Sequence, residues 1–85
     1  MKIEYSPKFA RQFKKLPREA KESAVKCEKL FKANPFDSKL GTHKLHGRMK
    51  EYWSFSVSYG CRITFSFVGD GLVRFHSAGS HDIYK

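Results

Sequence analysis

The side chains in this sequence that could carry chemistry are histidines, arginines, lysines and tyrosines, whereas acids are sparse. Histidine exchanges protons near neutral pH, and arginine and lysine bind phosphate. This set suits cleavage of RNA without a metal, because a ribose hydroxyl can attack the neighbouring phosphodiester while protein groups move protons and neutralise the phosphate. The candidate residues for proton transfer or RNA binding are His43, Lys44, His46, Arg48, Arg62, Arg74, His76, His81 and Tyr84.

Each candidate also has an ordinary structural explanation. The histidines within residues 43–46 fall in a predicted loop, where a surface histidine needs no function. Arg62 and Arg74 could serve only solubility on an outward strand face. Residues as close to the end of the chain as His81 and Tyr84 are often a loosely ordered tail or a packing anchor.

Other kinds of active site find no support in the residue pattern. No CxxC or His/Cys pair has the spacing of a zinc site, and neither a phosphate-binding loop nor a GxSxG nucleophile motif is present. Asp70 lies in a predicted turn and Asp82 near the end of the chain, so the paired carboxylates of a glycosidase or an aspartic protease are lacking. We therefore expect neither a metal nor a cofactor.

The charge of the chain points to a polyanionic partner. The 85 residues carry a formal net charge of +9. Residues 1–50 hold 14 Lys and Arg against five Asp and Glu, whereas residues 51–85 hold three of each. Such a surplus suits nucleic acid, a ribosome or a strongly acidic protein, and a solvated helix face rich in lysine is the alternative. Lys14 and Lys15, on the first predicted helix, are candidate RNA-binding residues for this reason.

The length and composition predict a single domain over residues 1–85. A chain this short buries only about 60% of its extended surface, which leaves room for one sheet and one helical layer. No apolar run reaches the roughly 20 residues that span a bilayer, and the first residues lack a signal-peptide block. Cys27 and Cys61 are too few for a disulfide framework and are expected to be reduced thiols. We expect a cytoplasmic protein with no membrane partner.

Two helices are predicted in the first half of the chain. A short alternating strand over residues 2–5 precedes the Ser6-Pro7 pair, whose members are favoured at the N-cap and the first position of a helix. Apolar side chains follow at helical spacing, and Pro17 ends this helix. A second amphipathic helix runs over residues 18–33, and the Asn34-Pro35 pair stops it.

The rest of the chain alternates as strands do. Apolar and polar residues alternate over 53–58, 62–67 and 73–76, with turns at Tyr59-Gly60 and Gly69-Asp70-Gly71. The predicted fold class is α+β: an N-terminal strand and a two-helix hairpin packed on one face of an antiparallel sheet. The other face is predicted to be open and to carry Ser54, Ser56, Ser58, Arg62, Thr64, Ser66, Arg74 and His76.

The order of these elements and several motifs resemble the RelE/ParE superfamily of bacterial type II toxins. Residues 45–47 (LHG), 52–57 (YWSFSV) and 60–65 (GCRITF) are similar to the LxG, WxxxV and YRIxY core of RelE-like and HigB-like toxins. The ending over residues 73–84 (VRFHSAGSHDIY) most resembles the YafQ branch, whose chains end in an RF, GTH and F pattern. The resemblance covers essentially the whole chain.

This resemblance implies a ribosome-dependent mRNA endonuclease that an acidic antitoxin silences. His43 matches the loop histidine of the YafQ pattern, His81 matches its C-terminal catalytic histidine, and Arg62 matches the strand arginine of the RelE pattern. Tyr84 resembles the terminal aromatic, although it stands one position nearer to His81 than the YafQ pattern has it. These four residues are the implied catalytic set. The implied partners are the antitoxin, the ribosome and mRNA.

The sequence departs from the YafQ pattern at three positions. The strand histidine falls at Ser56, the following aspartate falls at Gly60, and the tyrosine common before the strand arginine is Cys61. RelE-type members work with lysine, arginine and tyrosine instead, so loss of activity does not follow. Two other functions remain open. One is a ParE-like inhibitor of DNA gyrase that acts by binding alone, and the other is a catalytically inactive toxin that only binds antitoxin.

Overall fold

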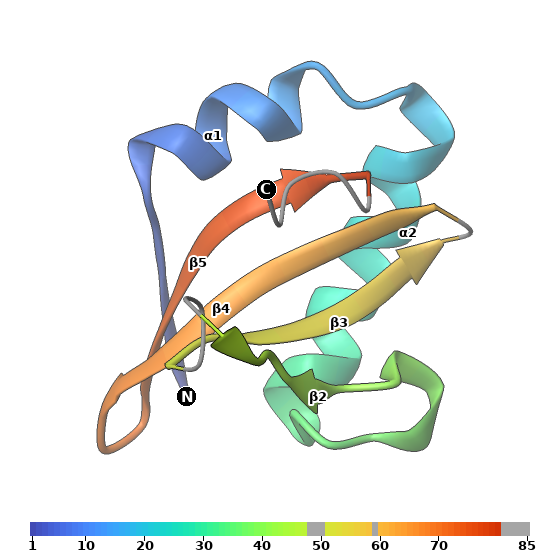
Figure 1. The fold of residues 1–85 in the computed structure, drawn as a ribbon. Coiled ribbons are helices and arrows are strands. Elements are labelled where there is room, and N and C mark those ends of the chain that lie inside the picture. The colour runs from blue at the N-terminus through green and yellow to red at the C-terminus, as the bar shows by residue number, and fades with distance from the viewer. Residues whose placement is uncertain (48–50, 59, 81–85) are drawn as a thin grey trace.

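The computed structural model describes residues 1–47, 51–58 and 60–80 (Figure 1). The predictions for Arg48, His81 and Tyr84 lie outside the described residues. The predicted helices and strands are all present, and one further strand, β2, lies where a loop was predicted. In chain order the elements are β1 (Lys2–Tyr5), α1 (Pro7–Lys14), α2 (Arg18–Ala33), a short 3₁₀ helix (Ser38–Leu40), β2 (His43–Lys44), β3 (Trp53–Ser58), β4 (Cys61–Gly69) and β5 (Leu72–Gly79).

Among the described residues, five strands form one sheet in the order β1-β5-β4-β3-β2. β1 runs parallel to β5, with Ile3 beside Val73, and the other neighbouring strands are antiparallel. The predicted α+β fold is confirmed, and its sheet is mixed rather than wholly antiparallel. The cause is the path of the chain, which leaves β1, passes through both helices and three strands, and returns beside β1 in the same direction.

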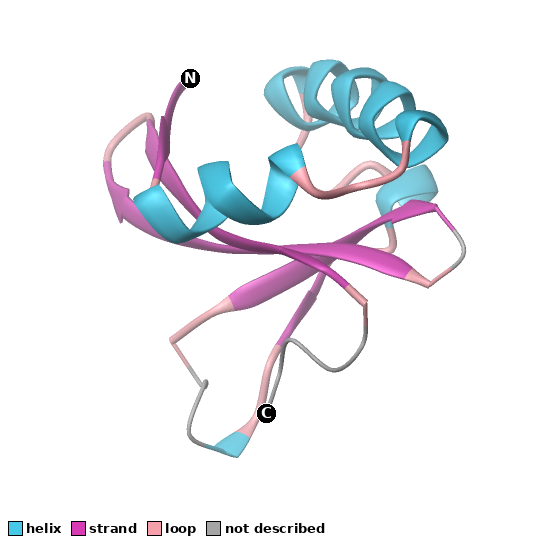
Figure 2. Cartoon of the chain, turned by 90° about the horizontal axis from the view of Figure 1, so that it is seen from above, coloured by secondary structure: helices cyan, strands magenta, loops and turns pink. Residues whose placement is uncertain are grey.

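Local sequence signals place both helices. The Ser6 hydroxyl accepts a hydrogen bond from the Phe9 backbone N–H at 3.0 Å, which caps α1, and Pro7 is the first helical residue. α2 begins directly after Pro17 and ends at Ala33. Both helices cover the same face of the sheet (Figure 2). Within the described ranges, no helix is long and apolar enough to cross a membrane.

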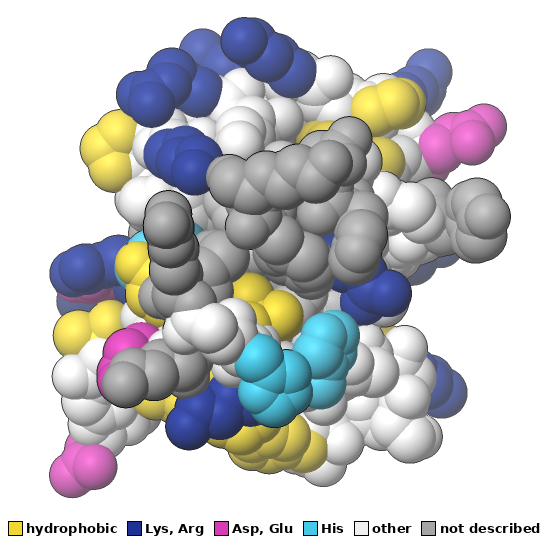
Figure 3. All heavy atoms as spheres, in the orientation of Figure 1, with side chains coloured by type: hydrophobic (Ala, Val, Ile, Leu, Met, Phe, Trp, Pro, Cys, Tyr) yellow, Lys and Arg dark blue, Asp and Glu magenta, His cyan; other side chains and the backbone are white. Residues whose placement is uncertain are grey.

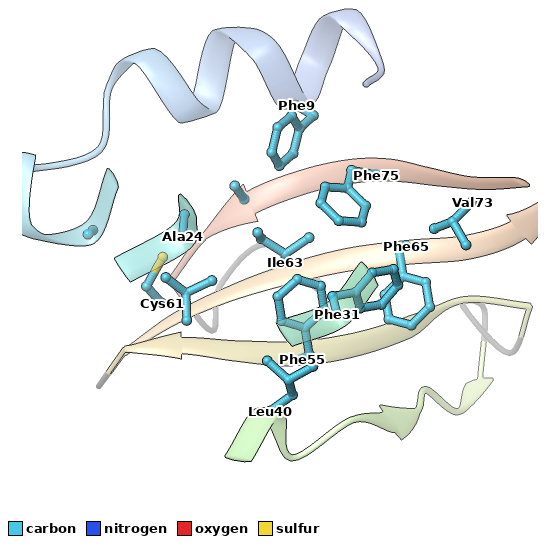
Figure 4. Close-up of a cluster of buried hydrophobic side chains, with 13 residues drawn as sticks. Phe9, Ala24, Phe31, Leu40, Phe55, Cys61, Ile63, Phe65, Val73 and Phe75 are labelled. Carbon is cyan, nitrogen blue, oxygen red and sulfur yellow. The ribbon is translucent and has the colours of Figure 1, made fainter. Parts of the chain in front are cut away.

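The core lies between the helices and the sheet and is rich in phenylalanine (Figure 4). Phe31, which comes from α2, is fully buried. Its ring centroid lies 5.1 Å from that of Phe55 on β3 and 4.8 Å from that of Phe65 on β4. It also lies 5.4 Å from the centroid of Phe75 on β5. One side chain of α2 thus contacts three neighbouring strands, which fixes the helix over the middle of the sheet.

A β-bulge in β5 decides which of its side chains reach the face of the sheet away from the helices, termed the front face. Thr64 of β4 pairs with Ser77, whereas the next residue, Phe65, pairs with Phe75. His76 is therefore the extra residue of the bulge. Since a bulge shifts the alternation by one residue, His76 and Ser77 both turn toward the front face.

Candidate active site

A row of polar residues crosses the middle of the front face. His43 on β2 pairs with Ser54 on β3, which pairs with Thr64 on β4. Thr64 in turn pairs with Ser77 on β5. The exposed fraction is 0% for Ser54 and Thr64 and 3% for Ser77. The prediction that the front face is open is therefore wrong at its centre.

Part of the covering comes from the segment between β2 and β3. The Leu45 N–H donates to the Tyr52 carbonyl at 2.9 Å, which extends the pairing of the two strands. The preceding pair, Lys44 and Trp53, lies toward the helices, so by alternation Leu45 and Tyr52 lie on the front face. Figure 2 shows the described part of this segment on the side away from the helices. Thr64 Oγ1 is buried here without a hydrogen-bond partner among the described residues.

Arg62 and His43, two of the predicted catalytic residues, lie on the front face on the two strands that flank β3. Arg62 pairs with Ser56 in the sheet, and its Nη1 donates to the Ser56 Oγ at 3.0 Å. Gly41 approaches the same hydroxyl, because a Cβ placed on Gly41 would stand 3.9 Å from the Ser56 Oγ. His43 Nδ1 lies 3.1 Å from the Gly41 carbonyl oxygen. These four residues, Gly41, His43, Ser56 and Arg62, form the Arg62–His43 cluster.

The hydrogen bond of His43 sets the position of its proton. A carbonyl oxygen can only accept a hydrogen bond, so the proton lies on Nδ1 and the neutral ring keeps Nε2 unprotonated. His43 is exposed, whereas Arg62 is half-buried. The cluster can therefore offer a proton acceptor and a phosphate-binding guanidinium on one face, which are two of the functions that RNA cleavage requires.

A second cluster, termed the Tyr52–His76 cluster, lies further along the front face and consists of Tyr52, Ser66 and His76. The His76 Nε2 and the Ser66 Oγ are 2.7 Å apart and share a hydrogen bond. The rings of Tyr52 and His76 are stacked, with centroids 4.3 Å apart and planes 7° from parallel. Burial, followed by the positive charges of Arg74 and Lys8, lowers the pKa of His76 from its usual 6.5. The ring is therefore neutral at physiological pH.

We expect the free energy of unfolding to fall between about pH 7 and about pH 5, in part because of His76. The lowered pKa means that the unfolded chain takes up a proton on this residue at a higher pH than the folded chain does. The stabilising contribution is present above the unfolded pKa of 6.5 and is lost as the pH falls through the lowered folded value. Urea unfolding at both pH values checks this. The decrease in the free energy of unfolding should be smaller for His76→Gln than for the wild type. Equal decreases in the two proteins would contradict the role of His76.

Arg74 is held by an acid on the neighbouring strand. Its Nε and Nη2 both donate to the Glu4 Oε1, at 3.1 and 2.8 Å. The two residues are register partners on β5 and β1. Arg74 therefore faces front as predicted, but its charge is partly neutralised within the protein.

The remaining predicted RNA-binding residues lie apart from the Arg62–His43 cluster. Lys44 is directed toward the helix side with its partner Trp53, and its Nζ stands 6.0 Å from the Trp53 ring centroid. Lys14 and Lys15 are exposed at the end of α1. His46 is exposed and directly follows Leu45. Figure 3, which views the front face, shows histidine side chains near β2 and Lys and Arg side chains gathered over α1.

Tyr52, Ser66 and Gly41 were not among the residues predicted to form the site. The position of Tyr52 had a usable signal, because it directly precedes Trp53 and so belongs on the opposite face of the same strand. The proximity of Gly41 to Ser56 had no such signal in the sequence, since it depends on the path of a loop. Among the described residues, no group of three or more His, Cys, Asp or Glu side chains could hold a metal ion.

Comparison with known proteins rests on structure, because no protein-family model and no curated protein matches this sequence. YafQ from E. coli strain BL21(DE3) superposes with a TM-score of 0.81 at 22% sequence identity, and the match covers 98% of this chain and 96% of that one. The chain has the RelE/YafQ fold.

Two further structures share the RelE/YafQ fold with this chain. The YoeB/ParE toxin from Agrobacterium tumefaciens has a TM-score of 0.81 at 19% identity, with 95% of this chain and 99% of that one covered. A chain of the E. coli DinJ-YafQ toxin-antitoxin complex has a TM-score of 0.78 at 22% identity, with 96% and 93% covered. The resemblance predicted from the sequence is thereby confirmed at the level of the fold.

Proposed function

We propose that this chain is the toxin of a type II toxin–antitoxin pair and that it cleaves mRNA on the ribosome. The observation that carries the proposal is the Arg62–His43 cluster, in which a guanidinium and an imidazole lie on the same face of the sheet, on the strands either side of β3, in a strongly basic chain. The RelE/YafQ fold over almost the whole chain supports it, because the toxins of known structure that share this fold cover the same length.

The chemistry proposed for the cluster is an internal transfer of the phosphate. The ribose 2′-oxygen attacks the adjacent phosphorus, the bond from phosphorus to the 5′-oxygen breaks, and a 2′,3′-cyclic phosphate and a free 5′-hydroxyl result. His43 Nε2 accepts the proton of the 2′-hydroxyl, and Arg62 stabilises the charge that grows on the phosphate. Ser56 holds the Arg62 guanidinium in place. The 5′-oxygen needs a proton in return, for which His81 and Tyr84 remain the predicted donors.

The proposed partners follow from charge and from the shared fold. Ribosomal RNA is a polyanion, and the exposed Lys14 and Lys15 at the end of α1 are proposed to contact it. An acidic antitoxin is proposed because the E. coli YafQ of the same fold occurs in a complex with DinJ. Because ribosomes lie in the cytoplasm, the activity is proposed to take place there.

Induction of the protein in bacterial cells tests the proposal against the alternatives. We expect incorporation of labelled methionine to stop within minutes, with no early DNA-damage response, and Arg62→Ala at the same protein level to leave translation unaffected. A DNA-damage response with filamentation would contradict the proposal and favour inhibition of gyrase. Normal growth at full protein level would also contradict it and would favour an inactive toxin that only binds antitoxin.

A further inference from the structure

We propose that Tyr52, backed by His76, is a stacking platform for one nucleobase of the RNA strand whose phosphate Arg62 binds. The inference rests on the proposed function and adds to it a second point of contact on the front face. Its ligand is the flat face of an unpaired base in a single strand. Aromatic side chains bind such bases by stacking, without reading their sequence.

The pair is built as a rigid surface rather than as two mobile side chains. The bulge turns His76 to the front face, and the hydrogen bond to the Ser66 Oγ fixes the plane of its ring. Tyr52 lies parallel on that ring, at 4.3 Å between centroids. Tyr52 as a residue is only partly buried. A ring that is already oriented loses little conformational entropy when a base stacks on it.

The position of the Tyr52–His76 cluster suits the binding of a base close to the scissile nucleotide. Ser66 and Arg62 lie on the same face of β4, four residues apart, which corresponds to about 13 Å along the strand. The buried row of Ser54, Thr64 and Ser77 lies between them, so an RNA strand that binds at both places crosses above the residues that cover this row. The two contacts would hold the RNA at separate nucleotides and fix its direction on the face.

The charges around the cluster favour stacking of a base over binding of a phosphate at this place. Burial and the nearby Arg74 and Lys8 keep His76 neutral, so its ring acts as an aromatic surface rather than as an anion-binding cation. Arg74 is itself paired with Glu4. The platform itself is uncharged and the guanidinium beside it is already engaged by Glu4, so the contribution assigned to this cluster is stacking.

Another aromatic group in the described part of the chain lies on the wrong face for this role. Phe36, Trp53 and Phe67 contact one another on the helix side of the sheet, and Phe36 is 53% exposed. A strand held by Arg62 on the front face cannot reach them. Phe36→Ala therefore serves as a matched control, since it removes an exposed aromatic ring of similar size from the opposite face.

The test measures the affinity of the protein for a fluorescent ten-nucleotide RNA at low salt, by anisotropy. Every ribose of the RNA is 2′-O-methylated, so it cannot be cleaved. Loss of one stacked base is expected to cost on the order of tenfold in affinity. We expect Tyr52→Ala to bind about tenfold more weakly, Tyr52→Phe to bind within about twofold of the wild type, and Phe36→Ala to be unchanged.

A series of RNAs with one abasic position each separates stacking from a loss of folding. The affinity of the wild type should fall about tenfold when one particular position is abasic. The affinity of Tyr52→Ala should not change when that position is abasic. Equal binding by the wild type and Tyr52→Ala would overturn the platform and leave RNA binding intact. An equal loss of affinity in both proteins at the abasic position would also overturn the platform. A wild type that binds no RNA would also overturn the platform, whereas the proposed function is tested separately by cleavage on ribosomes.

Discussion

Replacement of Arg62 by alanine is expected to lower the rate of mRNA cleavage by about 100-fold to 1,000-fold without unfolding the protein. A guanidinium that meets the growing negative charge of the transition state contributes on this order. Arg62 is half-buried on the front face, and the side-chain contact described for it is with the Ser56 Oγ, so its removal leaves the core in place. Cleavage rates on programmed ribosomes, measured with substrate in excess, give the effect directly.

Two variants control this measurement. Arg62→Lys keeps the charge but loses the planar fork that can bind two phosphate oxygens, so it should retain an intermediate rate. Arg74→Ala removes the same group from the same face, but its guanidinium is already occupied by Glu4, and we expect a loss of less than about tenfold. An Arg62→Ala protein with the wild-type rate would remove this residue from the mechanism.

Replacement of Phe31 by alanine is expected to have the largest effect on stability, about 3–5 kcal/mol in the free energy of unfolding. Phe31 has no exposed surface, and its ring contacts those of Phe55, Phe65 and Phe75. Its loss would leave a cavity between α2 and the three strands that the ring contacts, β3, β4 and β5. For a chain of 85 residues such a loss is a large share of the usual total stability.

The matched control for Phe31 is Phe36, five residues further along the chain. Phe36 is 53% exposed, so Phe36→Ala should cost less than about 1 kcal/mol. Urea unfolding followed by circular dichroism measures both variants under the same conditions. Equal effects of the two substitutions would show that Phe31 is not the centre of the core.

The elements of the fold could be predicted because their signals are local. Ser6-Pro7 caps α1, Pro17 separates the helices and Asn34-Pro35 follows the end of α2. The alternation of phenylalanine with serine, threonine and arginine identified β3 and β4, and Phe31 at helical spacing from Ala24 identified the buried side of α2. Each of these patterns is complete within a few residues.

The features that escaped prediction depend on residues far apart in the chain. The parallel pairing of β1 with β5 joins Ile3 to Val73, and no local pattern encodes its direction. The bulge at His76 is visible only in the pairing of two strands. β2 has two residues, too few to show alternation, so the turn of Lys44 toward Trp53 could not be read from its sequence.

The candidate site could be predicted only in part, because it too depends on residues that lie far apart in the chain. Arg62 follows the alternation of β4 and lies on the front face as expected. His43 was predicted from its residue type and from the family resemblance, and its hydrogen bond to Gly41 supplies the geometry that the sequence lacked. The buried state of Ser54 and Thr64 was missed, because the sequence does not tell what crosses a sheet face. The roles of His81 and Tyr84 stay predictions.

Primer extension on a defined mRNA in a reconstituted translation system tests the central claim most directly. Purified protein is added with ribosomes present or withheld, and Arg62→Ala is run beside the wild type at the same concentration. We predict cuts only when ribosomes are present, in register with the codons, and absent with Arg62→Ala. Cuts of equal strength without ribosomes would contradict ribosome dependence, and the absence of cuts in both conditions would contradict the nuclease itself.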